Sequence, residues 1–266
     1  MTHLIGDIGN TETKLCILNK SFKIVRRLKI DTLKINNQYY FKKMIFSFVQ
    51  NKIINKKALF SSVVPSVFFA IKKYFKKYFN IQCQELKQTY YSKIIKINAN
   101  KKQVGSDRIA NAIGAYCKYK SDCIVLDFGT ATTFDVINKG TYRGGIIAPG
   151  VNLSLSTLIN RADQIPSFTL KKINKVVGKN TISALRSGFY WGYAGLIENI
   201  LQLIRKETKR NYKIILTGGL SSLFKNSIKS KVFIDKDITM NGSQFIFEGS
   251  IANAFETELT VLEPTA

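Results

Sequence analysis

The sequence predicts an α/β protein made of two similar halves, residues 1–115 and 116–266. The first observation is a repeated segment: Asp7–Lys14 and Asp127–Asp135 carry one pattern 120 residues apart, each at the end of an apolar, strand-like run. The second is that strand-like and helix-like hydrophobic periods alternate along the chain. The third is the length of 266 residues, which suffices for two halves of about 130 residues, each with its own core.

The first half is expected to open with a three-stranded β-meander and then to alternate helices and strands. The strands are expected at His3–Asp7, Lys14–Leu18, Phe22–Ile30, Lys57–Val64 and Ile81–Leu86. Helices are expected at Tyr39–Gln50, Ser66–Phe79 and Ile109–Lys120. Ser66 is the expected N-cap of the second helix, and Asp107 is expected near the positive end of the third helix dipole.

The second half is expected to repeat the meander and to end in helices. Its strands are expected at Cys123–Asp127, Thr132–Asn138, Thr141–Ile147 and Lys213–Thr217, with a Lys139-Gly140 hairpin turn. Helices are expected at Val151–Arg161, Thr181–Lys209 and Phe245–Leu259. The long middle helix carries Gly188, Gly192 and Gly195, a spacing that permits close approach of another backbone.

Each repeated segment places an Asp-x-Gly turn between two strands. Such a turn exposes backbone N–H groups, and Asn10, Thr11 and Thr130 add side chains that hydrogen-bond phosphate oxygens. The carboxylates of Asp7 and Asp127 stand where a metal ion or its water would be held. A single turn of this kind is common in β-hairpins, but two in matching halves indicate a duplicated phosphate-binding turn.

The charge of the chain is strongly positive: 41 Lys and Arg stand against 17 Asp and Glu, a net charge of +24. Such a balance raises the question of nucleic acid or an anionic membrane. The lysines are spread along the chain, however, and the aromatic and basic run Ile71–Phe79 fits the solvated face of an amphipathic helix. We therefore expect neither nucleic acid nor a membrane as a partner, and expect the charge to attract anionic small molecules.

The cysteines and the single histidine limit the chemistry. The four cysteines include no Cys-x-x-Cys pair and the first residues lack a signal pattern, so we expect a cytoplasmic protein with free thiols. No apolar run reaches the length of a membrane span. His3 is the only histidine, which excludes Ser-His-Asp and Cys-His chemistry away from the N-terminus. The chemistry must therefore use carboxylates.

Four short motifs carry a family resemblance. They are Asp7-x-Gly9-Asn10-Thr11-x-x-Lys14, Gly105-x-Asp107-Arg108, Asp127-x-Gly129-Thr130-Ala131-x-Thr133-x-Asp135 and Gly144-Gly145-x-Ile147-x-Pro149-Gly150. With the duplicated meander and a late Thr-Gly-Gly, they resemble the superfamily of acetate and sugar kinases, chaperone ATPases and actin, and within it type III pantothenate kinase. The resemblance spans nearly the whole chain. It implies actin-like, ribonuclease H-like halves, each a mixed sheet flanked by helices, with the nucleotide in the cleft between them.

The resemblance implies an ATP:pantothenate phosphotransferase that makes 4'-phosphopantothenate, the first step of coenzyme A synthesis. Asp107 would be the base that orients or deprotonates the attacking hydroxyl, although spacing alone equally allows it to be a helix cap. A carboxylate beside Arg108 is expected to keep a low pKa. The residues implied to contact ATP are Asp7, Gly9, Asn10, Thr11, Thr13, Lys14 and Thr130. Those implied to contact pantothenate are Gly105, Ser106, Asp107, Arg108 and Thr181.

The resemblance also implies bound ions and a homodimer, and the chain differs from the family in one motif. Asp7 would hold Mg²⁺ through water, and Asp127 a monovalent cation, K⁺ or NH₄⁺. The family forms homodimers in which the second subunit helps to build the acceptor pocket, and the glycine-spaced helix is a candidate for that interface. Adenine would lie against Gly218-Gly219. Where the family often has Tyr-x-Asn-Pro, this chain has Asn98-Ala99-Asn100-Lys101, so Tyr90 or Tyr91 would replace the tyrosine.

Two other functions remain open at this point. One keeps the fold and changes the acceptor, giving another small-molecule kinase, and the pocket around Asn98–Arg108 would decide between acceptors. The other is a non-catalytic, nucleic-acid-associated accessory protein, which the net charge of +24 would favour. Against it stands the joint presence of the acidic, basic and hydroxyl residues that the kinase needs. A P-loop kinase is not expected, because no Gly-x-x-x-x-Gly-Lys-[Ser/Thr] occurs.

Overall fold

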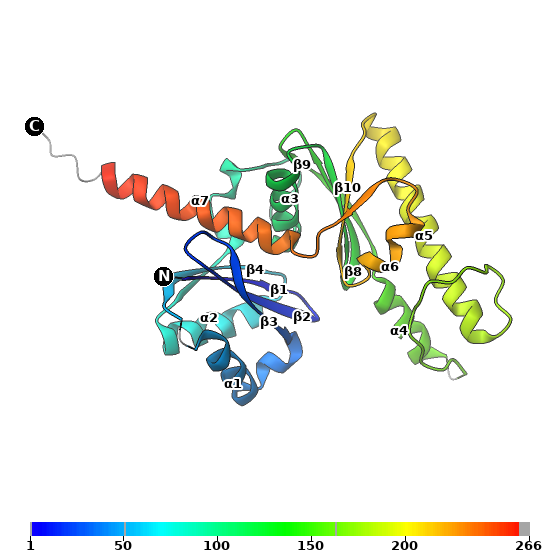
Figure 1. The fold of residues 1–266 in the computed structure, drawn as a ribbon, viewed down its shortest axis with the longest axis horizontal. Coiled ribbons are helices and arrows are strands. Elements are labelled where there is room, and N and C mark those ends of the chain that lie inside the picture. Colours follow the sequence, from blue (N-terminus) through cyan, green and yellow to red (C-terminus); the bar gives the residue numbers. More distant parts are fainter. Residues whose placement is uncertain (1, 51, 163, 261–266) are drawn as a thin grey trace, which may run out of the picture. The chain divides into compact units, whose positions relative to one another are not determined.

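The computed structural model describes residues 2–50, 52–162 and 164–260, and the chain divides into two compact units (Figure 1). Unit 1 comprises Met1–Lys118, Gly140–Tyr142 and Asp237–Ala266. Unit 2 comprises Tyr119–Lys139 and Arg143–Lys236. Among the described helices, none combines the length and the hydropathy that a membrane-spanning segment needs.

Unit 1 is built on a five-stranded mixed sheet with the order β3-β2-β1-β4-β5. Its strands are β1 (Thr2–Ile8), β2 (Glu12–Leu18), β3 (Ile24–Asp31), β4 (Ile54–Ser62) and β5 (Gln82–Glu85). The first three form the predicted antiparallel meander, while β4 and β5 run parallel to β1. Parallel neighbours need crossover helices, which explains why helices alternate with strands after the meander.

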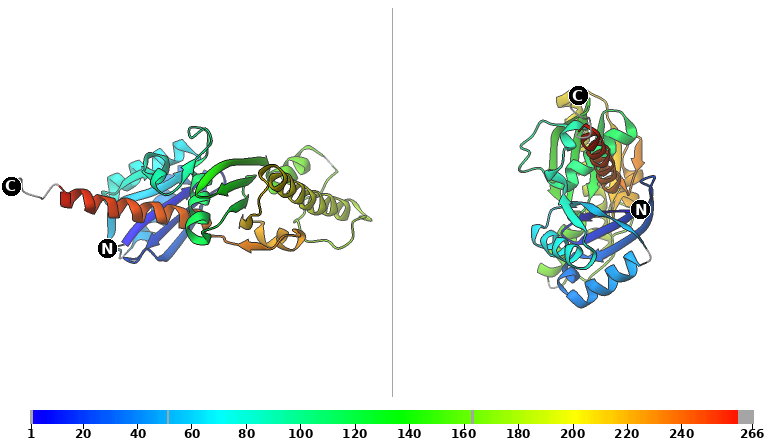
Figure 2. Two further views of the ribbon diagram at one scale, coloured as in Figure 1. Left: turned by 90° about the horizontal axis from the view of Figure 1, so that it is seen from above. Right: turned by 90° about the vertical axis from the view of Figure 1, so that its left-hand side faces the viewer.

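Helices cover both faces of this sheet. The η1 turn (Thr32–Asn36), α1 (Gln38–Val49) and α2 (Pro65–Phe79) pack on the face that presents Leu4, Leu15 and Phe60. Because side chains alternate along a strand, Ile5, Cys16 and Leu59 point to the opposite face and are buried there. On that side α7 (Ile238–Thr260) contacts β1 and β4 (Figure 2).

A second helix of unit 1, α3 (Ser106–Tyr119), packs tightly on α7. A Cβ at Gly114 would lie 2.2 Å from the Ile238 carbonyl oxygen, and one at Gly242 would lie 1.8 Å from the Ala110 carbonyl oxygen. Only glycine fits at these two positions, so the two backbones meet directly. Thr239 Oγ1 also donates a hydrogen bond to Asn111 Oδ1 at 2.6 Å. This contact fixes α3 on unit 1.

The second sheet has six strands in the order β11-β10-β7-β8-β9-β6. The strands are β6 (Lys96–Ile97), β7 (Cys123–Phe128), β8 (Ala131–Asn138), β9 (Thr141–Pro149), β10 (Lys213–Gly218) and β11 (Val232–Ile234). In unit 2, α4 (Val151–Arg161), α5 (Thr181–Thr208) and α6 (Ser221–Phe224) share one hydrophobic core with the sheet. Phe128 stacks on Phe224 at 5.2 Å, and Tyr190 stacks on the same ring at 5.8 Å. The predicted mixed α/β fold with two helix-flanked sheets is thus confirmed.

Several local expectations need correction. Ser66 does not cap α2: the N-cap is Val64, which makes no side-chain hydrogen bond, and Pro65 at the first helical position supplies the preset φ angle instead. The last helix begins seven residues earlier than predicted, at Ile238, because tertiary packing on α3 overrides the weak helix propensity of Gly242. The 3₁₀ turns η2 (Leu86–Gln88), η3 (Tyr91–Lys93) and η4 (Lys225–Ser227) were not expected.

Candidate active site

The candidate residues of unit 1 gather at one edge of its sheet. β1, β4 and β5 are parallel, so their carboxyl ends meet there, at Asp7, Ser62 and Glu85. The Val63 amide also donates to the Ile8 carbonyl oxygen at 3.0 Å, which ties the strand ends together. In open α/β sheets ligands bind outside the carboxyl ends of the strands. This edge is therefore the candidate substrate site of unit 1.

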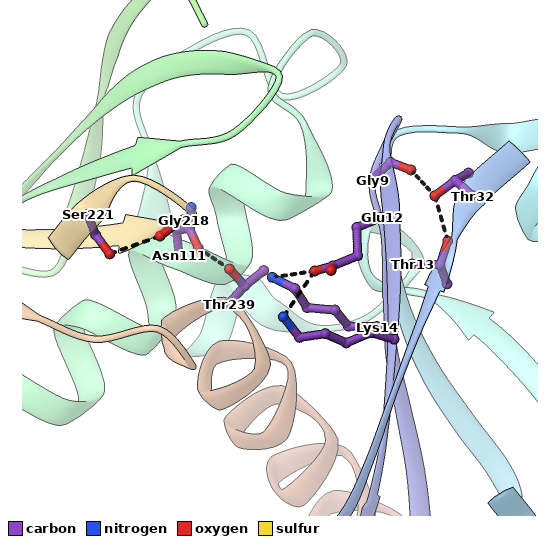
Figure 3. A network of polar contacts seen from close by, with 10 residues as sticks. Gly9, Glu12, Thr13, Lys14, Thr32, Asn111, Gly218, Ser221 and Thr239 are labelled. Atoms are coloured by element: carbon purple, nitrogen blue, oxygen red, sulfur yellow. Dashed lines mark hydrogen bonds and ion pairs between the residues drawn. The ribbon is translucent and has the colours of Figure 1, made fainter. Parts of the chain in front are cut away.

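The first Asp-x-Gly turn links β1 to β2. The Gly9 amide donates to the Glu12 carbonyl oxygen at 3.1 Å, and Asn10 and Thr11 at the tip are exposed. Thr32 Oγ1 donates to the Gly9 carbonyl oxygen at 2.8 Å and lies 3.0 Å from Thr13 Oγ1 (Figure 3). Thr13 is fully buried on the face under α1, because the strand pleat turns it away from Asp7. The Thr13 hydroxyl therefore stabilises the turn through its hydrogen bond with Thr32.

Lys14 occupies the other face, directly across from Asp7. Its ammonium nitrogen lies 3.6 Å from Glu12 Oε1 (Figure 3). The Lys29 ammonium lies 3.5 Å from the same oxygen. Lys29 is the cross-strand neighbour of Lys14 on β3. Two like charges directly opposite each other are unfavourable in a sheet, and Glu12 offsets the repulsion. Sequence reasoning missed Lys29 and Glu12, since only the register of the strands brings them together.

Asp107 lies near the positive end of the α3 dipole, as the sequence predicted, but α3 begins at Ser106, three residues earlier than expected, so Asp107 belongs to the first turn and is not the cap. Its Oδ1 accepts a hydrogen bond from the Arg108 amide at 2.8 Å, and a Cβ on Gly105 would be 2.4 Å from that oxygen. The carboxylate therefore folds back over the bare backbone of Gly105. Burial raises the pKa of Asp107, and the amide hydrogen bond and the positive charge of Arg108 lower it by less. The expectation of a low pKa was wrong, because desolvation outweighs the neighbouring cation.

Arg108 lies over the ring of a tyrosine that sequence reasoning missed. Its guanidinium carbon lies 5.9 Å from the centre of the Tyr142 ring, and Tyr142 is almost fully buried at the start of β9. The Asn98 amide donates to the Tyr142 carbonyl oxygen at 2.9 Å. Of the two tyrosines suggested for the family contact, Tyr90 is exposed and Tyr91 is buried. No spacing in the sequence distinguishes Tyr142 as a neighbour of Arg108.

The second Asp-x-Gly turn, in unit 2, is shorter than the first. Four residues separate the paired Ile8 and Thr13, whereas three separate the paired Phe128 and Thr132. The Gly129 amide donates to the Ala131 carbonyl oxygen at 3.1 Å. The residues on either side of this turn differ from those of the first.

Asp127 is flanked by hydroxyl side chains on both neighbouring strands. Its cross-strand partners are Thr133 on β8 and Thr217 on β10. A Cβ on Gly218 would lie 2.6 Å from Asp127 Oδ1, so the carboxylate rests against glycine backbone. Gly218 has φ +82°, a conformation that glycine adopts without strain. A carboxylate among neutral oxygens is a donor set that fits a hard cation such as K⁺.

Thr130 at the tip of the second turn is exposed and close to the start of α4. A Cβ on Gly150, the N-cap of α4, would lie 2.0 Å from the Thr130 carbonyl oxygen. Glycine there lets the turn approach the helix N-terminus, where unpaired N–H groups and the helix dipole favour anions. The Gly144–Gly150 motif is explained in part by this close contact.

Unit 1 offers fewer ligands for a divalent ion around Asp7 than unit 2 offers for a cation around Asp127. Within the described residues, no three His, Cys, Asp or Glu side chains are grouped as metal ligands. Asp7 is paired in register with Ser61 on β4, and the fully buried Ser61 Oγ makes no hydrogen bond there. A carboxylate beside a hydroxyl without a partner fits Mg²⁺ that keeps most of its water shell, as Mg²⁺ usually does.

The remaining predicted residues lie in unit 2. Thr181 is exposed at the first position of α5, which Asn180 caps. Asn180 Oδ1 accepts from the Ser183 amide at 2.9 Å, and Ser183 Oγ accepts from the Asn180 amide at 3.1 Å. Next to the strand end at Gly218, a Cβ on Gly219 would meet nothing within 4 Å. Ser221 Oγ donates to the Gly218 carbonyl oxygen at 2.9 Å and closes this turn (Figure 3).

Two helix-flanked sheets, each with an Asp-x-Gly turn after its first long strand, define the actin-like class of kinases and ATPases. A sequence model of the type III pantothenate kinase family matches residues 3–203. Type III pantothenate kinase of Pelagibacter ubique is 57% identical over 239 residues, which cover 90% of this chain and 96% of that protein. The Koribacter versatilis enzyme of the same description is 34% identical, with 96% and 98% covered. The chain belongs to the type III pantothenate kinase family.

Solved structures agree with this class at the level of the fold. A putative Baf family transcriptional activator from Campylobacter jejuni superposes with a TM-score of 0.58 at 20% identity, covering 94% of this chain and 99% of that one. The activator of 2-hydroxyisocaproyl-CoA dehydratase from Clostridium difficile, solved with bound ADPNP, gives 0.57 at 12% identity with both chains fully covered. At these identities the likeness concerns the fold alone.

Proposed function

We propose that the chain transfers the γ-phosphoryl group of ATP to pantothenate, giving 4'-phosphopantothenate in the first step of coenzyme A synthesis. The observation that carries the proposal is the family match over residues 3–203, with 57% identity to a relative described as this enzyme. Asp107 at the start of α3, and Asp7 at the carboxyl end of β1, support it. Phosphoryl transfer needs mainly positioning, charge neutralisation and one group to orient the acceptor hydroxyl.

Asp107 is the group that accepts the proton of the attacking hydroxyl. Burial raises its pKa and so makes its carboxylate a stronger base than an exposed aspartate. Arg108, stacked on Tyr142, offers a guanidinium to the carboxylate of pantothenate. Backbone groups of Gly105 and Ser106, and the exposed Thr181, complete the proposed acceptor contacts.

The two phosphate turns bind ATP. Gly9, Asn10, Thr11 and Thr130 contribute backbone and side-chain donors, Lys14 contributes positive charge, and Thr13 acts through its backbone because its hydroxyl is buried on Thr32. Asp7 would hold Mg²⁺ through water, and the ion would neutralise charge on the transferring group. Asp127 would hold K⁺ or NH₄⁺ with the hydroxyls of Thr133 and Thr217. Bare backbone at Gly219 would receive adenine.

A homodimer that uses the glycine face of α5 fits this function. A Cβ at Gly188, Gly192 or Gly195 would meet no atom within 4 Å, so this face of α5 is open to another backbone. Trp191 beside it is 37% exposed. The enzyme would act in the cytoplasm, where ATP and free thiols occur together.

The test is ATP-dependent phosphorylation of pantothenate by the purified protein, with Mg²⁺ and with K⁺ or NH₄⁺ against Na⁺. We expect turnover that needs K⁺ or NH₄⁺ and that an Asp107→Asn variant lacks, together with a dimeric mass by light scattering. Turnover of a different acceptor alone would replace pantothenate in the proposal. ATP binding without turnover of any acceptor would overturn it.

A further inference from the structure

Glu85, the last residue of β5, uses both of its carboxylate oxygens. Oε2 accepts a hydrogen bond from the Lys87 amide at 2.8 Å and so caps the η2 turn. Oε1 accepts a hydrogen bond from the Ser106 hydroxyl, which belongs to the first residue of α3. The negative charge of Glu85 also adds to burial in raising the pKa of the nearby Tyr91. One carboxylate therefore joins the end of a strand to the start of the helix that carries Asp107.

Ser106 itself is enclosed. Its side chain is only 2% exposed, and its hydroxyl also lies 3.1 Å from the Ser62 carbonyl oxygen at the end of β4. A hydroxyl has a single hydrogen to donate, and a charged carboxylate is the stronger acceptor. We call Glu85, Ser106 and the Ser62 carbonyl the α3 anchor. The hydroxyl hydrogen ties the helix start to the end of β5 through Glu85, and the hydroxyl oxygen lies next to the end of β4.

Asp107 follows Ser106 directly and has little room to move. An ideal Cβ on Gly105 would lie 2.4 Å from Asp107 Oδ1 and 3.5 Å from Val63 Cγ1. The Asp107 carboxylate therefore lies against the Gly105 backbone, beside the anchor. Any shift of the first turn of α3 moves the carboxylate with it. Misplacing a catalytic group by about 1 Å lowers a rate by about 100-fold.

We infer that Glu85 is a positioning residue for phosphoryl transfer: through Ser106 it holds the first turn of α3 so that the Asp107 carboxylate meets the acceptor hydroxyl. The inference rests on the proposed function, and it assigns to the Ser106 side chain a structural duty in place of a substrate contact. Glu85 does not touch the reacting atoms.

A simpler explanation is that Glu85 serves only as the cap of η2. The same unit shows what such a cap requires: Asp31 caps η1 with one oxygen, which accepts from the Leu33 amide at 3.0 Å. Glu85 meets that need with Oε2 alone, and its second oxygen is committed to α3. The two explanations differ in what happens at Asp107 when the carboxylate is removed.

The experiment compares Glu85→Ala, Glu85→Gln, Ser106→Ala and the double Ala variant in steady-state kinetics. Asn37→Ala is the matched control, because Asn37 caps α1 in the same unit by accepting from the Tyr40 amide at 3.0 Å, away from α3. We expect kcat to fall about 10- to 100-fold in Glu85→Ala and Ser106→Ala, with KM for ATP unchanged. The double variant should be no worse than either single one, because both remove the same contact.

Two further readouts separate positioning from stability. Removal of the anchor lets water reach Asp107 and lowers its raised pKa, so the acid limb of the pH profile of kcat/KM should move to lower pH. Asn37→Ala should lose similar thermal stability but leave the acid limb in place. Amide hydrogen exchange in the first turn of α3 should speed up in Glu85→Ala only. Glu85→Gln, which keeps one acceptor, should give an intermediate result and remain folded if the Ala variant does not.

The inference is overturned if Glu85→Ala and Ser106→Ala keep wild-type kcat, acid limb and exchange rates, or lose activity only in proportion to folded protein. Failure of the proposed function looks different: the wild-type protein would then phosphorylate no pantothenate. In that case exchange in the first turn of α3 still decides, since unchanged protection in Glu85→Ala would refute the anchor itself.

Discussion

The contact between α3 and α7 should not tolerate a single added methyl group at Gly242. An ideal Cβ there would lie 1.8 Å from the Ala110 carbonyl oxygen, whereas ordinary contact begins at 3.4 Å. The two helices would have to separate by about 1.6 Å, the difference between these distances. The obstructing atom belongs to a helix backbone and cannot rotate away, so the strain must be relieved by moving a whole helix.

The expected cost follows from that geometry. Overpacking a well-packed core costs about 1–3 kcal/mol, and a clash with rigid backbone belongs at the upper end. Separation of the helices also stretches the 2.6 Å hydrogen bond from Thr239 to Asn111. A loss of about 3 kcal/mol corresponds to a fall in Tm of about 6–12 °C for a chain of this size. Because α3 carries Asp107, kcat should fall as well.

Thermal unfolding followed by circular dichroism tests this reasoning, with Gly249→Ala as control. Gly249 lies in the same helix, and a Cβ there would meet nothing within 4 Å. Alanine should stabilise that position by about 0.5–1 kcal/mol, because glycine loses more backbone entropy in a helix. The same substitution in one helix should thus have opposite signs at two positions. Equal Tm values for Gly242→Ala and Gly249→Ala would refute the direct contact of α3 with α7.

Four other predictions concern the two phosphate turns, the base and the thiols. Asp107→Asn should abolish turnover. It should also raise Tm at pH 7 but not at pH 3, because folding raises the pKa of Asp107 and the buried carboxylate lowers stability only when the pH is high enough to ionise it. Thr32→Val leaves a buried hydroxyl unsatisfied and should cost about 1–3 kcal/mol in urea unfolding while raising KM for ATP. Thr133→Lys places an ammonium opposite Asp127 and should remove the K⁺ requirement, measured as equal rates in K⁺ and Na⁺. Burial raises the pKa of Cys16 and Cys83 to about 12, so a disulfide reagent at pH 8 should modify neither in the native protein.

The elements with strong hydrophobic periods were predictable from the sequence. Both meanders and α1 to α5 lie within a few residues of their expected ranges. The expected Lys139-Gly140 turn is present, with φ of 44° and 68° at its two residues. Short elements escaped prediction because their stability comes from neighbours: β6 has two residues and is held by its pairing with β9. The start of α7 escaped for the same reason, since Gly242 is favoured by contact with α3 and disfavoured by local propensity.

The candidate site was predictable only as a set of positions along the chain. The motifs named Asp7, Lys14 and Asp107, but the surroundings of each depend on strand register and burial. Arg108 is adjacent to Asp107 in sequence, which suggested a depressed pKa, whereas burial determines the direction. Tyr142 and Glu85 are both distant from the Gly-x-Asp-Arg motif in sequence. They contact it because β9 pairs with β6 and β5 ends beside β4.

The two Asp-x-Gly turns share one local design but have different neighbouring residues. In each sheet an aspartate is the second-last residue of the first strand of a parallel pair, so strand geometry fixes the place of the carboxylate. What differs are the residues on either side: Asp7 has Lys14 and Ser61, whereas Asp127 has Thr133 and Thr217. A lysine beside a carboxylate suits an anionic phosphate with a hydrated divalent ion, because both charges are then balanced. Thr133 and Thr217 place hydroxyl oxygens on both strands next to Asp127, and oxygen ligands suit the monovalent cation that we propose there. We therefore attribute the different ions proposed for the two turns to their cross-strand neighbours more than to the turn motif itself.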